Sequence, residues 1–127
     1  MSLSVVYTRA AIGVKAPLIS VEVHLSNGLP GLTLVGLPET TVKEARDRVR
    51  SAIINSGYAF PAKKITINLA PADLPKEGGR YDLPIAIALL AASEQLNTPG
   101  LSSCEFVGEL ALTGALRGVP GAISGAL

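Results

Sequence analysis

The chain has 127 residues, of which 48% are hydrophobic and only 4% aromatic, and its formal net charge is +1 at pH 7. This length fits a single domain, and the shortage of aromatic rings means that Val, Ile, Leu and Ala must fill its core. A net charge so close to zero excludes a strong overall attraction to nucleic acid or membranes, so such contacts would need local clusters of basic side chains.

The cysteine count and the apolar runs indicate the compartment. Cys104 is the only cysteine, which excludes an internal disulfide and a paired-cysteine metal or redox motif. The longest apolar run, Leu83–Ala92, is too short to cross a bilayer, and the chain does not open with a basic segment followed by an apolar one. We therefore expect a cytoplasmic protein that makes no contact with a membrane.

The first forty residues predict three strands. Runs rich in Val and Ile cover Ser4–Ala11 and Pro17–Leu25, and the second of them alternates apolar with polar side chains. The turn-forming residues Ser26–Gly28 then lead to a third apolar stretch, Gly31–Leu37. We expect these strands to form a hairpin or meander.

A helix is expected next, over Thr41–Ser56. Thr41 and Glu44 have the spacing of a capping box, in which two side chains bind the first free backbone amides. Apolar residues then recur on one helical face, and Gly57 suits a left-handed stop. Together these signals predict an amphipathic helix that packs one side on the core.

The second half of the chain continues with a strand, a loop and a second helix. The alternation in Lys64–Leu69 predicts the strand, and two Pro and two Gly make Ala70–Arg80 a loop. We interpret Asp82 as the cap of an apolar helix that runs to about Leu96. The remaining expected elements are two short strands and a last helix, at Glu105–Leu110, Ala115–Arg117 and from about Pro120.

No complete catalytic or metal site is recognisable. A phosphate-binding P-loop places Lys and Ser or Thr after its glycines, whereas in Lys76–Arg80 the lysine comes first. The single His24 and the single Cys104 are far apart in the sequence, and no third ligand is spaced to join them. We therefore expect no catalytic residue, no metal ligand and no cofactor in this sequence.

Basic residues give the most suggestive pattern. Lys43, Arg46 and Arg50 are three and four residues apart, so they project from one side of the expected helix. Arg48, Lys63 and Lys64 could extend that surface. The pattern is typical of a contact with nucleic acid or with another subunit.

An ordinary solvated helix surface is the alternative interpretation. Glu39, Glu44 and Asp47 are interleaved with the basic residues and could pair with them. No aromatic residue is interleaved with the basic ones, so the sequence gives little support for the stacking of single-stranded bases. Both interpretations therefore remain open at this point.

Several segments closely resemble the N-terminal domain of the magnesium-chelatase-like ATPases of the ComM/YifB type. The longest resemblance covers Gly28–Pro38 and then Val42–Arg50. The match continues in the same order through Ile65–Asp73, Lys76–Gly78, Tyr81–Ala86 and Gly108–Leu110. It extends over essentially the whole chain, and it implies that 1–127 form one domain placed ahead of an AAA+ ATPase domain that this sequence lacks.

The resemblance also implies a fold and a function. In that family the domain has a ribosomal protein S5 domain 2-like fold, an α/β (α+β) architecture in which a mixed sheet packs against helices, as in Lon protease and RadA C-terminal domains. ComM-type proteins are associated with natural transformation, in which a hexameric helicase drives branch migration of DNA. The chain would then be a non-catalytic module that supports ring assembly and DNA engagement, while ATP and Mg belong to the absent domain.

Comparison with Lon suggests which catalytic residues are missing. Lon uses a Ser nucleophile and a Lys base in this fold, and the resemblance places Asp82 at the Ser position and Ile123 near the Lys position. A carboxylate cannot serve as the acylated nucleophile, and an isoleucine cannot accept a proton. A Ser–Lys peptidase built from displaced residues and a protein-interaction platform remain the alternative functions.

Overall fold

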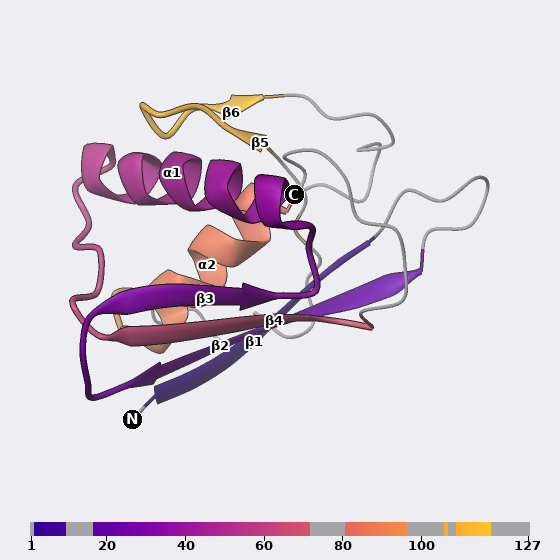
Figure 1. The fold of residues 1–127 in the computed structure, drawn as a ribbon. Coiled ribbons are helices and arrows are strands. Elements are labelled where there is room, and N and C mark those ends of the chain that lie inside the picture. The colour runs from indigo at the N-terminus through magenta and orange to yellow at the C-terminus, as the bar shows by residue number, and fades with distance from the viewer. Residues whose placement is uncertain (1, 10–16, 72–80, 97–105, 107–108, 118–127) are drawn as a thin grey trace.

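A computed structural model describes residues 2–9, 17–71, 81–96, 106 and 109–117 of the chain (Figure 1). Within these residues the backbone forms a four-stranded sheet, two helices and a small two-stranded sheet. The helices are α1 (Glu39–Asn55) and α2 (Asp82–Ala92). The strands are β1 (Ser2–Arg9), β2 (Leu18–Ser26), β3 (Gly31–Val35), β4 (Lys64–Ala70), β5 (Glu109–Leu110) and β6 (Leu116–Arg117).

The large sheet is mixed and has the strand order β1-β2-β4-β3. β1 and β4 each run antiparallel to β2, whereas β3 runs parallel to β4 after the crossover through α1. The expected antiparallel pairing of the first two strands is confirmed, whereas a meander of all three is wrong, because β4 lies between β2 and β3. Every second residue of β4 is a large apolar side chain that is at most 1% exposed, and pairing on both edges encloses such a strand more completely than an edge position would.

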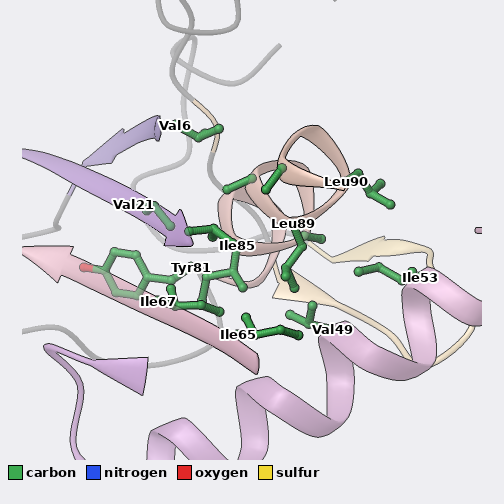
Figure 2. Close-up of a cluster of buried hydrophobic side chains, with 14 of the residues drawn as sticks. Val6, Val21, Val49, Ile53, Ile65, Ile67, Tyr81, Ile85, Leu89 and Leu90 are labelled. Atoms are coloured by element: carbon green, nitrogen blue, oxygen red, sulfur yellow. The ribbon is translucent and has the colours of Figure 1, made fainter. Parts of the chain in front are cut away.

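One face of the sheet forms the core together with both helices, as Figures 1 and 2 show. Strict alternation in β2 and β4 directs Val21, Val23 and Ile67 inward, and all three are fully buried. The inner side of α1 contributes Val49, and α2 contributes Leu89. The expected α/β class, with a mixed sheet packed against helices, is confirmed.

The start of α1 differs from the expected capping box. The helix begins at Glu39, and its N-cap is Pro38, which makes no side-chain capping bond. The Val42 amide donates to the Pro38 carbonyl oxygen at 3.0 Å, so Thr41 and Glu44 lie inside the helix instead of capping it. The fixed φ of proline, −61° here, sets the turn that begins the helix two residues earlier than predicted.

The end of α2 also differs from the prediction, since the helix stops at Ala92 and not near Leu96. Glu94 adopts a left-handed φ of 61°, and the Gln95 amide donates to the Leu90 carbonyl oxygen at 2.8 Å. This turn satisfies carbonyl groups that the helix end leaves free. The last helix expected from Pro120 lies outside the described residues.

Candidate functional site

A pocket of about 480 Å³ opens between the outer flank of α1 and the end of the sheet where β3 and β4 begin. Its size falls within the range of about 300–1,000 Å³ that is common for ligand sites. Both charged and apolar side chains line it. The lining includes Arg46, Arg50 and Lys63 as cations and Leu32, Ile54, Phe60 and Ile65 as apolar groups.

Local structure explains why the cations meet there. Arg46 and Arg50 are one helical turn apart on α1, so they lie on the same flank while Val49 turns into the core. Lys63 directly precedes β4, and its carbonyl oxygen accepts a hydrogen bond from the Gly31 amide at 3.4 Å. This bond holds the starts of β3 and β4 together beneath the helix flank.

No carboxylate in the described part of the chain neutralises the three pocket cations. Within the described residues, none of Arg46, Arg50 and Lys63 forms a salt bridge. Glu44 instead approaches Arg48 on the other flank of α1, at 3.7 Å. In the described part of the chain, neither pocket arginine therefore forms a salt bridge within α1, which the interpretation as a solvated surface requires.

Two further contacts shape the pocket rim. The Arg50 guanidinium carbon lies 5.8 Å from the centroid of the Phe60 ring, within the range of a cation–π interaction. Lys63 Nζ donates to Asn27 Oδ1 at 3.3 Å, which leaves its remaining N–H groups available to a ligand. The rim thus combines three cations with one aromatic ring.

The structure separates the five predicted contact residues into two groups. Arg46, Arg50 and Lys63 line one pocket, whereas Lys43 and Lys64 are exposed but do not line it. Phe60 is the component that sequence reasoning missed, because it lies in the connection between α1 and β4 and not among the basic residues of the helix. The sequence signal that could have found Phe60 is its position three residues before Lys63, which was already predicted to belong to the basic surface.

Asp82 occupies a second polar site, and it does not cap α2. The N-cap is Tyr81, without a side-chain capping bond, and the Asp82 side chain is 1% exposed. Arg48 Nε donates to Asp82 Oδ2 at 2.6 Å and Arg48 Nη2 to Oδ1 at 3.3 Å. The Leu110 amide donates to Oδ2 at 3.1 Å, so a single carboxylate connects α1, α2 and β5.

Asp82 stands at the position that the comparison with Lon gives to the Ser nucleophile. Asp82 is enclosed and bound by two elements, so its carboxylate is not open to a substrate. Ile123 lies outside the described residues. Within the described residues, no group of three or more His, Cys, Asp or Glu side chains is placed to hold a metal ion.

Comparison with known proteins assigns the chain to a family. The family model described as "Subunit ChlI of Mg-chelatase" matches residues 21–127, and the chain belongs to this family. It is 84% identical to YifB of Escherichia coli over 126 residues, and 70% identical to the competence protein ComM of Haemophilus influenzae over 123 residues. A Mycobacterium tuberculosis protein is 38% identical over 127 residues.

The alignments also relate this chain to the length of its relatives. They cover 99% of the chain for YifB, 97% for ComM and 100% for the mycobacterial protein. In each case the chain spans only about a quarter of the relative's own length, 25%, 24% and 25% respectively. Across the residues that the structure describes, neither helix has the length and apolar character needed to span a membrane.

Proposed function

We propose that this chain is a non-catalytic N-terminal module of a longer magnesium-chelatase-like AAA+ ATPase, and that it contacts DNA through the pocket formed by Arg46, Arg50 and Lys63. In this proposal the longer protein assembles as a cytoplasmic hexamer and drives branch migration during natural transformation. The ATPase domain, and not this chain, binds ATP and Mg.

The observation that carries the DNA contact is the convergence of three cations that lack carboxylate partners among the described residues. An open pocket with unneutralised Arg and Lys side chains suits phosphate, because guanidinium groups bind phosphate oxygens in pairs. The net charge of +1 adds little to the attraction for DNA, so that attraction depends on this local cluster of cations. The relative named as a competence protein, at 70% identity, supports a role in competence.

Fluorescence anisotropy with labelled single-stranded and branched DNA tests the proposal. We expect binding that weakens as salt increases, because bound phosphates release counterions. Arg46→Gln should weaken binding and reduce the slope of the logarithm of the binding constant against the logarithm of salt concentration by about 1.

The matched control is Thr40→Glu, which changes the net charge by the same amount at an exposed site on α1 outside the pocket. Equal losses in Arg46→Gln and Thr40→Glu would assign the attraction to overall charge and not to the pocket. Undetectable binding of both DNA forms at low salt would remove the DNA contact from the proposal and leave ring assembly to be tested in the longer protein.

A protein-interaction platform is the second candidate, and one observation favours it. An apolar pocket of about 120 Å³ lies where α1, α2 and the β5–β6 hairpin meet, and Tyr58, Leu83 and Ile87 line it. Tyr58 is 39% exposed there. If this surface joins neighbouring subunits, Tyr58→Asp should reduce the mass of the assembled longer protein in analytical ultracentrifugation while Arg46→Gln leaves it unchanged.

A further inference from the structure

We propose that the basic pocket is a seat for one unpaired nucleotide of a single strand, with the base against Phe60 and the apolar wall and the phosphate among Arg46, Arg50 and Lys63. This inference rests on the proposed DNA contact and specifies its ligand. It predicts a preference for single-stranded over duplex DNA.

The apolar wall distinguishes this pocket from a simple phosphate site. Leu32 of β3 is a partly exposed member of the lining and Ile54 of α1 is 45% exposed, whereas Ile65 of β4, at 1% exposed, offers almost no surface to a ligand. A phosphate group needs cations and N–H donors and gains nothing from such a surface. A nucleobase has a flat apolar face that Phe and aliphatic side chains can cover, and this contact tolerates any base.

The position of Arg50 links the two halves of the ligand. Its guanidinium carbon is 5.8 Å from the Phe60 ring centroid, so one side chain contacts the aromatic wall and also contributes to the charged rim. Because this guanidinium lies over the Phe60 ring, a base that stacks on the ring must displace it, and the displaced Arg50 side chain is then free to pair with the phosphate of the same nucleotide. Arg46, one turn away on α1, and Lys63 complete the cationic surroundings.

Duplex DNA fits the pocket less well than a single strand. Its phosphates can reach exposed arginines, but its bases are stacked and paired inside the helix and leave the apolar wall uncovered. In a single strand the base can turn out of the backbone and enter the pocket. An acidic segment of a second copy of this chain would meet the cations with carboxylates and would show no dependence on nucleotide structure.

Phe60→Leu is the variant that tests this inference, because it removes the ring and keeps an apolar side chain. We expect it to weaken binding of a labelled 20-nucleotide oligothymidylate by about tenfold, and to change duplex binding by less than about twofold. Phe60→Tyr keeps the ring and should restore single-strand binding. Tyr58→Leu is the matched control, since Tyr58 is an exposed aromatic residue nearby that lines the other pocket.

Competition distinguishes a strand from a free nucleotide. Thymidine 5′-monophosphate should displace the oligonucleotide only at concentrations far above the dissociation constant of the strand, because the strand adds phosphate contacts on both sides of the seated base. Equal potency of the free nucleotide and the strand would assign the pocket to free nucleotides and overturn the assignment to a strand.

Three other results would overturn the inference, and they differ in what they say about the proposed function. Equal effects of Phe60→Leu on single-stranded and duplex DNA, with binding still sensitive to Arg46→Gln, would overturn the nucleotide seat and keep the DNA contact. Absence of all DNA binding would overturn both. Self-association that Arg50→Gln abolishes, in a chain that binds no DNA, would assign the pocket to a second copy.

Discussion

Replacing Asp82 by Asn tests whether the buried carboxylate holds α1, α2 and β5 together. Asp82 accepts two hydrogen bonds from Arg48, at 2.6 and 3.3 Å, and one from the Leu110 amide at 3.1 Å. Asparagine keeps the size of the side chain but removes its charge, and its amide group replaces one acceptor oxygen by a donor. At least one of these hydrogen bonds is then lost at a side chain that is only 1% exposed.

The expected loss is about 3 kcal/mol of unfolding free energy. Breaking a buried ion pair by removing one partner costs about 3–5 kcal/mol, because the other charge stays buried without compensation. Arg48 is 22% exposed, so its guanidinium can regain some water, and this places the effect at the lower end of that range. An effect of this size would be a large share of the stability of an ordinary domain.

Urea unfolding followed by circular dichroism measures this loss. The matched control is Glu44→Gln, which removes the other carboxylate near Arg48, at 3.7 Å and with a side chain that is 69% exposed. We expect this surface change to cost at most about 0.5 kcal/mol. An Asp82→Asn variant as stable as Glu44→Gln, with the same dependence on urea concentration, would refute the structural role of this carboxylate.

Three further predictions concern the backbone, the core and the alternative activity. Gly36→Ala should lose more than about 1 kcal/mol of stability in urea unfolding, because φ is +102° and a Cβ there would overlap the Leu69 carbonyl oxygen. Gly57→Ala is the control, and it should lose clearly less, because Gly57 has a φ of +89° but open space around it. Ile67→Ala should lower the unfolding free energy by about 2–5 kcal/mol, since Ile67 is fully buried, and a loss under 1 kcal/mol would contradict the core described above. The chain should leave casein intact and remain unlabelled by serine-directed probes, and cleavage or labelling that requires the folded chain would restore the peptidase interpretation.

Local patterns in the sequence predicted most of the elements, because alternation and helical spacing depend on near neighbours. β2 and β4 alternate strictly, and both occur close to their predicted positions. The place of β4 between β2 and β3 could not be predicted in the same way, since strand pairing depends on residues far apart in the chain. The start of α1 was misplaced because Pro38 fixes the first turn in place of the expected Thr41 cap.

For the candidate site, too, the sequence predicted the local features and missed those that depend on distant residues. The spacing of Arg46 and Arg50 placed both on one flank of α1, which is a local property of any helix. Phe60 joins them only because the connection after α1 folds back towards the start of β4. Asp82 was predicted to be a cap from its position before an apolar helix, but its partners, Arg48 and Leu110, come from other elements.

Amide chemical-shift mapping by NMR tests the central claim most directly. Adding a short oligothymidylate to the ¹⁵N-labelled chain should shift the amides of Gly31, Arg46, Arg50, Phe60 and Lys63, which surround one pocket on three segments of the chain. Shifts confined to the opposite, half-exposed face of the sheet, or the absence of shifts at saturating oligonucleotide, would contradict the claim that this domain acts by binding a strand at that pocket.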